Sequence, residues 1–424
     1  MFKFIHAADI HLDSPPSGLL QCAGSEAEGL RDITRRAFEG LVRVAIDERV
    51  AFVVIAGDLF DGDWKDFNTG LFLARQLGRL REAGIRVFIV LGNHDAESNL
   101  TKSLPRIDGV TIFPSRSGPP IVLEDLGVAL HGRSFKERNT VEDLVPSYSA
   151  PIVGAFNIGL LHTAVEGNVA HASYAPCSLA ELQNKGYEYW ALGHVHAAAV
   201  LHRDPWIVFP GNLQGRHAGE TGPKGAALVT VEDRSVVRFD PVPVDVLRWS
   251  RLEVDVEGAP SRSMVEDRVR EAMAAAIERD ADKRPMAIRI TVRGRTRAHD
   301  EILAREEEFR ADLRALAASL GDDVAFVEKI RIETVPESTQ TLAAGGVAHE
   351  AADELGRMLE EAPADAELLA ELKADLAELL GKLHEEVRGK IDEGPLAWLK
   401  EERLDQVVRD GAALLLARLG VGAR

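Results

Sequence analysis

Hydrophobic positions in the first hundred residues fall in short unbroken runs, and amphipathic stretches separate these runs. The runs predict buried β-strands at "FKFIHAAD", "AFVVIAG" and "IRVFIVLG". The stretches around residues 29–49 and 66–83 predict helices between the strands. Because strands that alternate with helices are typical of a layered α/β sheet, we expect such a sheet at the start of the chain.

The pattern changes after residue 110, where short strand-like runs follow one another with turns rich in Gly and Pro between them. These runs are "VTIFP", "GVALHG", "FNIGLLH", "YEYWALG", "PWIVFPG", "GAALVTV" and "SVVRFDPV". Together with the first strands they predict a mixed sandwich with helices outside, and we place this first domain at residues 1–248.

A second α/β pattern begins near residue 250. The runs "RLEVDVEG", "PMAIRITVRG" and "VAFVEKIRIETV" predict strands, with helices over residues 262–280 and 300–319 between them. This βαβαβ unit of roughly ninety residues is large enough for a small domain, which we place at residues 249–335. The segment "PESTQTLAAGGVA", residues 336–348, is the expected linker.

The last part of the chain, residues 349–424, is rich in Ala, Leu and Glu and predicts a helical tail. Leucines recur at intervals of three and four, which indicates an amphipathic helix: Leu368, Leu372, Leu376, Leu379 and Leu383. One interpretation is a helix that packs back on its own protein. The other is an apolar stripe that docks on a partner, and the sequence does not choose between them.

Composition and charge narrow the class of protein. A length of 424 residues suggests two or three domains, and 46% hydrophobic residues without a run of the ~20 that a membrane span needs indicates no membrane insertion. The N-terminus resembles no secretory signal, and Cys22 and Cys177 are not in C-x-x-C spacing, so we expect a cytoplasmic protein without disulfides.

A formal net charge of −18 argues against a nucleic-acid partner at first sight. Residues 251–424 hold 26 Lys and Arg against 38 Asp and Glu, a balance of −12, so the acidity lies mainly in the second half. Metal ions on carboxylates of the first half would bring that half closer to neutrality.

Polar side chains gather just after five of the predicted strands. The segments "AADIH", "AGDLFD", "LGNHD", "LLHT" and "LGHVH" supply Asp9, His11, Asp58, Asp61, Asn93, His94, Asp95, His162, His194 and His196. The carboxyl ends of parallel strands form the crevice in which ligands of α/β sheets bind. Any one segment alone has an ordinary structural explanation, and the ordered set of five is what indicates a site.

Carboxylate, amide and imidazole groups are ligands for divalent cations such as Mn²⁺, Fe²⁺ or Zn²⁺. Seven ligands shared between two ions, with room for water and substrate, would activate a hydroxide and neutralise phosphate charge. The sequence therefore predicts a two-metal centre that hydrolyses phosphate esters.

The ordered motifs D-x-H, G-D-x-x-D, G-N-H-D, H and G-H-x-H resemble the calcineurin-like metallophosphoesterase superfamily over residues 1–250. "FIHAADIHLDSP", "IAGDLFD" and "VLGNHD" resemble its SbcD-type DNA-repair nuclease branch, and "PGNLQGRHAGETGPKG" is most similar to the bacterial YhaO-type exonucleases. The resemblance implies a four-layer sandwich and two divalent ions, typically Mn²⁺, with Fe²⁺, Mg²⁺ or Zn²⁺ as alternatives.

The resemblance also implies a role for each motif residue. The first metal would be bound by Asp9, His11, Asp58 and His196. The second would be bound by Asp58, Asn93, His162 and His194, with Asp58 bridging.

His94 would stabilise the transition state or protonate the leaving oxygen, and such help is typically worth ~10²–10⁴-fold in rate. Archaeal and eukaryotic relatives have histidine where this chain has Asp61. That carboxylate would either orient His94 or an outer water, or simply cap its loop.

Arg216, His217 and Lys224 lie in the glycine-rich loop 210–225, where cations and backbone amides would hold DNA phosphates beside the metals. The alternative is an ordinary surface loop.

The resemblance implies a DNA exonuclease of DNA repair and leaves endonuclease cutting open. Residues 249–335 would be its DNA-capping domain, and the tail would dock on a coiled-coil, SMC-like ATPase. It also allows a homodimer. Two other functions stay open, namely a phosphatase or cyclic-nucleotide phosphodiesterase on small substrates, and a non-catalytic adaptor of the ATPase. The extra domain and tail count against the first, and the full set of ligands with His94 counts against the second.

Overall fold

A computed structural model of the chain describes residues 1–16, 18–19, 30, 32–61, 67–96, 107–165, 174–321, 324–337, 347–382, 397–398 and 403–418. Cys22, Leu383 and most of the expected linker, residues 338–346, lie outside this part. The described chain divides into two compact units. The first comprises residues 1–251, 275–289 and 320–329, and the second comprises residues 252–274, 290–319 and 330–424.

The first sheet has six strands in the order β12-β11-β1-β2-β3-β4. Its strands are β1 (Phe2–Ala7), β2 (Phe52–Ala56), β3 (Arg86–Val90), β4 (Val110–Ile112), β11 (Gly225–Glu232) and β12 (Ser235–Pro243). Strands β1 to β4 are parallel, and β11 is antiparallel to β1. The carboxyl ends of β1, β2 and β3 therefore lie at one edge of the sheet.

The second sheet also has six strands, in the order β5-β6-β7-β8-β10-β9. Its strands are β5 (Ile121–Leu123), β6 (Val128–Gly132), β7 (Phe156–His162), β8 (Tyr189–Gly193), β9 (Ala199–Arg203) and β10 (Trp206–Phe209). Strands β6, β7, β8 and β10 are parallel, whereas β5 and β9 pair antiparallel at the edges.

Apolar side chains fix the order of the layers. Phe4, Phe52, Phe88, Phe156 and Tyr189 belong to one buried cluster that holds the two sheets together. The rings of Phe4 and Phe52 stack at 5.1 Å, and such aromatic pairs typically add about 0.5–1.5 kcal/mol beyond their burial.

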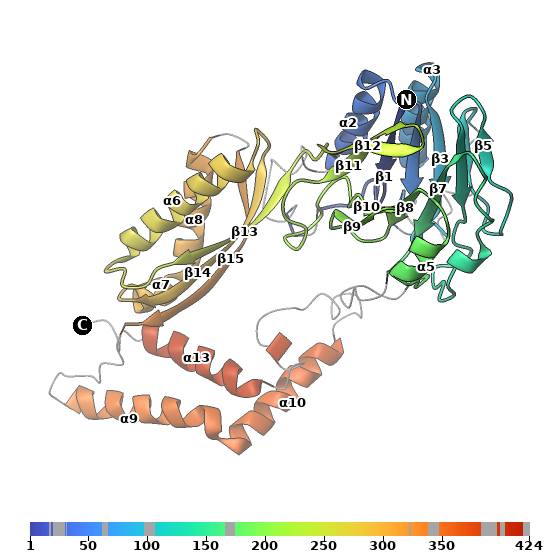
Figure 1. Ribbon diagram of the computed structural model, residues 1–424. Coiled ribbons are helices and arrows are strands. Elements are labelled where there is room, and N and C mark those ends of the chain that lie inside the picture. Colours follow the sequence, from blue (N-terminus) through green and yellow to red (C-terminus); the bar gives the residue numbers. More distant parts are fainter. Residues whose placement is uncertain are drawn as a thin grey trace. The chain divides into compact units, whose positions relative to one another are not determined.

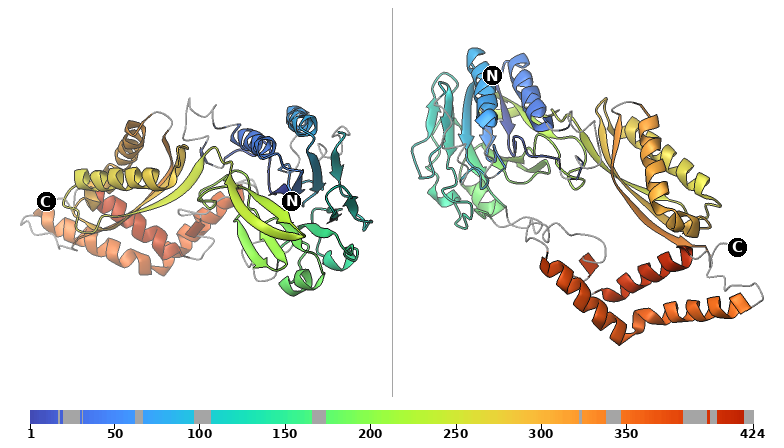
Figure 2. Two further views of the ribbon diagram at one scale, coloured as in Figure 1. Left: turned by 45° about the horizontal axis from the view of Figure 1, so that its top comes forward. Right: turned by 180° about the vertical axis from the view of Figure 1, so that it is seen from behind.

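Helices cover the outer faces of both sheets. Helices α2 (Ile33–Asp47) and α3 (Phe67–Glu82) pack on the first sheet through a second apolar cluster, and both lie on the same side of that sheet (Figures 1 and 2). The short α5 (Leu179–Asn184) packs on the second sheet through Leu182 and Trp190. This helix–sheet–sheet–helix order confirms the expected four-layer α/β sandwich.

A third sheet has the order β13-β14-β15. The chain here runs β13 (Arg248–Asp255), α6 (Arg262–Asp280), β14 (Met286–Thr296), α7 (His299–Ala304), α8 (Glu306–Ser319) and β15 (Ala325–Pro336). The expected single helix over 300–319 was wrong, because the backbone leaves the helical conformation at Arg305 (φ −126°, ψ 43°). Three glutamates then open α8, and acidic residues favour a helix N-terminus.

The tail contains α9 (Val347–Glu361), a 3₁₀ turn η3 (Ala362–Ala364), α10 (Ala366–Lys382) and α13 (Leu404–Arg418). Helix α13 contacts α7, α9, α10 and η3, all within the second unit. None of the described side chains of α10 is buried, and Leu368 and Leu379 are 38% and 47% exposed. The tail thus packs back on its own unit and also leaves leucines uncovered.

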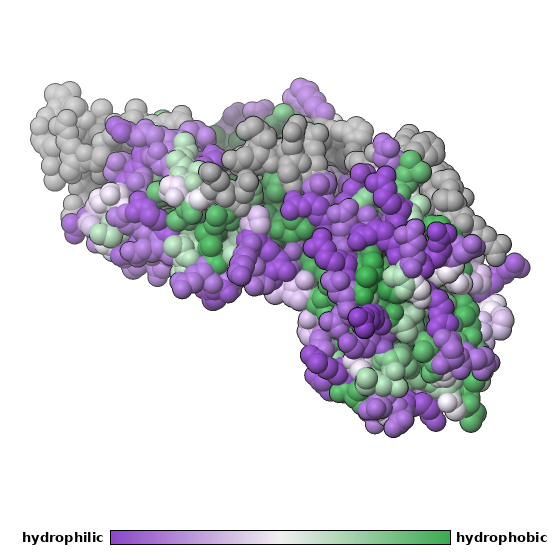
Figure 3. Space-filling model, turned by 90° about the horizontal axis from the view of Figure 1, so that it is seen from above, coloured by the Kyte–Doolittle hydropathy of each residue, from purple (hydrophilic) through white to green (hydrophobic). Residues whose placement is uncertain are grey.

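Among the described residues, no helix combines the length and the apolar character needed to cross a bilayer. On the face seen in Figure 3, hydrophilic residues cover much of the described surface, with hydrophobic residues interspersed among them.

Candidate metal centre

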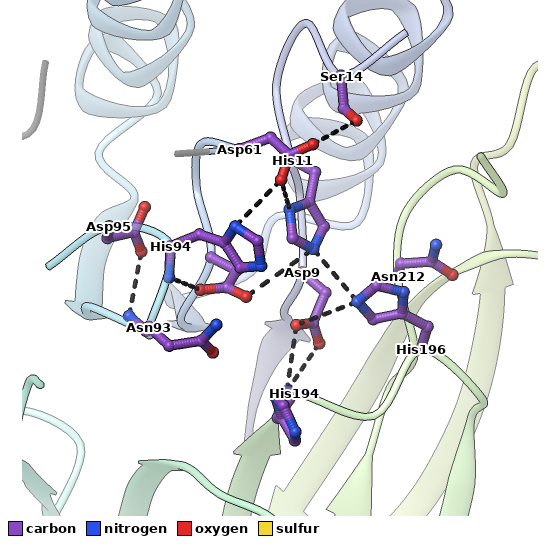
Figure 4. Close-up of polar contacts among 12 residues, drawn as sticks. Asp9, His11, Ser14, Asp61, Asn93, His94, Asp95, His194, His196 and Asn212 are labelled. Carbon is purple, nitrogen blue, oxygen red and sulfur yellow. Dashed lines mark hydrogen bonds and ion pairs between the residues drawn. The ribbon is translucent and has the colours of Figure 1, made fainter. Parts of the chain in front are cut away.

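Five of the seven predicted metal ligands lie at or just after the carboxyl ends of parallel strands. Asp9 follows β1, Asp58 follows β2 and Asn93 follows β3, all in the first sheet. His162 ends β7 and His194 follows β8 in the second sheet. Because the sandwich brings the two sets of strand ends together, both sheets contribute to one site (Figure 4).

The backbone at this site is unusual for residues with side chains. Asp9, His11, Asp58 and His194 have φ values of 50°, 45°, 54° and 106°. This left-handed region is sparsely populated by residues other than glycine, and such strain tends to gather at functional sites.

Two glycines permit the close approach of these segments. A Cβ on Gly193 would overlap the Ala56 carbonyl oxygen at the end of β2, and one on Gly92 would overlap Asp58 Oδ1. The glycines before His194 and Asn93 are therefore required by contact between the loops.

The first cluster joins His11, His196 and Asp9. The two Nε2 atoms of His11 and His196 are 3.2 Å apart, and His196 Nε2 lies 3.8 Å from Asp9 Oδ1. His11 Nε2 is also 3.9 Å from Asp58 Oδ2. Burial, followed by the neighbouring Arg216, holds the pKa of His11 well below its usual value. His11 is therefore neutral and able to offer a lone pair to a metal.

The second cluster joins Asp58, His162 and Asn93. His162 Nδ1 donates to the Ala56 carbonyl oxygen at 2.9 Å, which leaves the lone pair of the neutral ring on Nε2. That Nε2 lies 3.0 Å from Asn93 Oδ1 and 3.5 Å from Asp58 Oδ2. Asp58 thus has one carboxylate oxygen within 4 Å of both His11 and His162.

His194 contributes to the site with its backbone N–H and with its ring. Its backbone N–H donates to both carboxylate oxygens of Asp9, at 3.1 and 3.0 Å. Its ring lies beside the His162 ring, with centroids 5.2 Å apart. Val195 is buried in the apolar cluster on the outer side of the second sheet, so the side chain between His194 and His196 packs away from the predicted metal ligands.

These donor atoms fit divalent cations. In the second cluster the lone pair of His162 Nε2 faces the oxygens Asn93 Oδ1 and Asp58 Oδ2. These three atoms repel one another, and a cation bound among them would be coordinated by all three. In the first cluster, His11 Nδ1 is buried without a hydrogen-bond partner among the described residues. Burial raises the pKa of Asp9, and nearby cations would reverse that shift.

His94 and Asp61 form a pair beside the clusters. His94 Nδ1 is 3.1 Å from Asp61 Oδ1, and this hydrogen bond raises the pKa of His94. Burial alone would raise the pKa of Asp61, but His94, Arg216 and Ser14 together lower it. The His94 and Asp61 side chains are 25% and 31% exposed, so the pair is accessible from solvent.

The three loop residues expected to hold phosphate lie in different settings. Arg216 Nη1 donates to Asp61 Oδ2 and Ser14 Oγ, both at 3.2 Å, which places its cation beside His94. His217 is half-exposed. Lys224 is buried, and its Nζ donates to the His196 carbonyl oxygen at 3.0 Å, so its ammonium supports the backbone of a predicted ligand.

Two acidic residues at the site were given no role in the sequence analysis, although Asp95 stands in one of its five segments. Asp95 accepts backbone N–H groups from Leu59, Phe60 and Gly92 at 3.1 Å and so ties the loops after β2 and β3 together. Burial and then Asp58 raise its pKa to about 7.

The other is Glu220, in the loop 210–225, which contacts His196 at 2.5 Å. Burial would raise the pKa of Glu220, but hydrogen bonding to His196 and the nearby charges lower it to about 2. The motif "LGNHD" and the loop contained these two residues, but spacing alone does not show which carboxylates turn inward.

Comparisons with known proteins agree with this geometry. Residues 2–198 match the family model described as calcineurin-like phosphoesterase, and residues 249–335 match the middle domain of metallophosphoesterase YhaO. The chain is 31% identical over 343 residues to the "Uncharacterized metallophosphoesterase YhaO" of Bacillus subtilis (strain 168), covering 80% of this chain and 83% of that protein.

More distant relatives are named "DNA double-strand break repair protein Mre11". The chain is 28% identical to the protein from Aeropyrum pernix, over 60% of this chain and 64% of the relative. It is 27% identical to the protein from Haloferax volcanii, over 64% and 58%. With the YhaO match over most of both chains, and with the clustered Asp and His side chains, the chain belongs to the calcineurin-like metallophosphoesterase family.

Proposed function

We propose that the protein is a metal-dependent DNA phosphodiesterase, an exonuclease that acts in DNA repair in the cytoplasm. The observation that carries this proposal is the convergence of buried lone-pair donors from both sheets beside the accessible pair His94 and Asp61. The names of the Mre11 relatives support DNA as the substrate class.

The metal ligands divide into two sets around Asp58. Asp9, His11 and His196 would bind the first cation, and their ligand atoms lie within 4.8 Å of one another. Asn93, His162 and His194 would bind the second, and Asp58 would serve both. We propose Mn²⁺ as the cation, with Fe²⁺, Mg²⁺ or Zn²⁺ as alternatives.

The cations would supply an activated water and positive charge against the phosphate oxygens. His94 would supply a proton to the leaving oxygen. Because Asp61 raises the pKa of His94, the ring stays protonated over more of the neutral range, and with Nδ1 engaged by Asp61 the Nε2 proton is the one available. Arg216 holds Asp61 in place from the other side.

Other parts of the chain would serve the same activity. Arg216 and His217 would contact phosphates of the DNA strand, with Lys224 supporting the loop. Residues 249–335 would guide DNA as a capping domain. The uncovered leucines of α10 would dock on an SMC-like coiled-coil ATPase, and a homodimer is the proposed assembly.

An assay with Mn²⁺ tests the substrate class. End-labelled single- and double-stranded DNA is offered beside bis-p-nitrophenyl phosphate, with Asp58→Asn as the inactive variant and Asp47→Asn, an exposed residue of α2, as its matched control. We expect DNA shortening by wild type and by Asp47→Asn alone. Turnover of the small diester without DNA cutting would favour a small-substrate phosphodiesterase, and no turnover by metal-loaded protein would favour an adaptor.

A further inference from the structure

Glu220 is a buried carboxylate with hydrogen-bond donors around both of its oxygens. One oxygen, Oε1, lies 2.5 Å from His196 Nδ1. The other, Oε2, accepts from Asn212 Nδ2 at 3.0 Å and from the backbone N–H of Arg216 at 2.7 Å. Glu220 is only 7% exposed, so these contacts are shielded from water.

The contact with His196 decides which nitrogen of that ring carries a proton. An ionised carboxylate only accepts hydrogen bonds, so Nδ1 of His196 must be the donor. In the neutral ring this leaves the lone pair on Nε2, the atom that lies 3.2 Å from His11 Nε2 and 3.8 Å from Asp9 Oδ1. Glu220 therefore selects the tautomer in which His196 can bind a metal.

The loop that carries Glu220 is itself held in place by β13. Trp249 Nε1 donates to the Gly215 carbonyl oxygen at 2.8 Å, and Arg251 Nε donates to the Ala218 carbonyl oxygen at 2.7 Å. The two acceptor residues, Gly215 and Ala218, precede and follow Arg216 in the sequence. The segment that carries the carboxylate is thus held by hydrogen bonds from the neighbouring strand.

The same carboxylate reaches the other side of the site through Arg216. Its Oε2 accepts the backbone N–H of Arg216, whose guanidinium donates to Asp61, the partner of His94. A chain of contacts therefore runs from His196 through Glu220 and Arg216 to the His94 pair.

We propose that Glu220 is a positioning residue for His196, which fixes the tautomer and ring orientation of this metal ligand before a cation arrives. The inference rests on the proposed two-metal function. Residues that orient metal-binding histidines in this way typically change metal affinity by about 10–100-fold.

The test measures metal binding and tautomer without any substrate. Titration of metal-free protein with Mn²⁺ compares wild type, Glu220→Gln and Glu188→Gln. Glu188 is a matched control because it is a carboxylate of the first unit that, like Glu220, accepts a backbone N–H at 2.7 Å, here that of Asn157, and it lies outside the metal clusters. We expect one Mn²⁺ to bind about 10–100-fold more weakly to Glu220→Gln and both to bind normally to Glu188→Gln.

Two further readouts separate positioning from a general structural role. Histidine ¹⁵N spectra of metal-free wild type should show His196 protonated on Nδ1, and saturating Mn²⁺ should restore phosphodiesterase activity to Glu220→Gln. Unchanged Mn²⁺ affinity in a folded Glu220→Gln protein overturns the inference. If that variant does not fold, the wild-type spectrum decides, and protonation on Nε2 overturns it. Wild type that binds no Mn²⁺ would instead refute the proposed function.

Discussion

Replacement of His94 by glutamine tests the division of labour at the site. The His94 backbone N–H donates to Asp58 Oδ1 at 3.0 Å, and this bond survives a change of side chain. Its ring contacts Asp61 and is 25% exposed, whereas the side chains of His11 and His162 are 1% and 0% exposed. We therefore expect His94→Gln to retain both metals and to lose catalysis.

The expected loss follows from the proton that His94 would supply. General acid catalysis contributes about 10²–10⁴-fold, which corresponds to about 3–5 kcal/mol of transition-state stabilisation. DNA has a poor leaving oxygen that needs a proton, whereas p-nitrophenolate leaves without one. The loss should thus reach this full range on DNA and be clearly smaller on bis-p-nitrophenyl phosphate.

Initial rates on both substrates, with metal content measured by mass spectrometry, check this reasoning. His202→Gln serves as control because His202 is a partly exposed residue of the edge strand β9 and lies outside the metal clusters. Loss of metal from His94→Gln would mean that His94 is a ligand. Equal losses on the two substrates would refute the role as acid and leave only charge stabilisation.

Three other changes probe the surroundings of the site. Asp61→Asn should lower the rate about tenfold or more; because Asp61 raises the pKa of His94, the fall in rate at alkaline pH should also move to lower pH, as a pH–rate profile would show. In metal-free protein, Asp95 has a pKa of about 7 when folded and its ordinary, lower pKa when unfolded. The free energy of unfolding should therefore fall as pH rises from about 4 to 7. Urea melts of Asp95→Asn should show a weaker dependence of this free energy on pH. In Gly193→Ala the new methyl group would push against the Ala56 carbonyl that holds His162. The free energy of unfolding should fall by about 1–3 kcal/mol, and Mn²⁺ should bind more weakly. An unchanged Mn²⁺ titration would contradict the close approach.

The sequence was sufficient for the sandwich because the sandwich depends on local patterns, and it placed the candidate ligands beside the strand ends; their roles as metal ligands stay a prediction. Most strands are distinct apolar runs, and Asp9, Asp58 and Asn93 follow such runs. The short edge strands β5 and β9 were not predicted, since three to five residues beside turns carry little periodic signal.

The partners of the ligands could not be predicted in the same way. Glu220 meets His196 and Arg216 meets Asp61 across 24 and 155 residues of sequence. Such contacts depend on how β13 holds the loop 210–225, and the spacing of residues along the sequence does not indicate this. Likewise, Lys224 resembles a phosphate ligand in the sequence and lies buried against the His196 backbone in the structure.

The origin of the ligands from two sheets has a consequence for the stability of the protein. A cation held by Asp58 from one sheet and His162 from the other would act as a reversible cross-link through the sandwich. At a free concentration 100-fold above its dissociation constant, one such ion adds about 2.7 kcal/mol to the free energy of unfolding. The supply of divalent cations in the cell would then help to determine how much of this protein stays folded, as well as how fast it works.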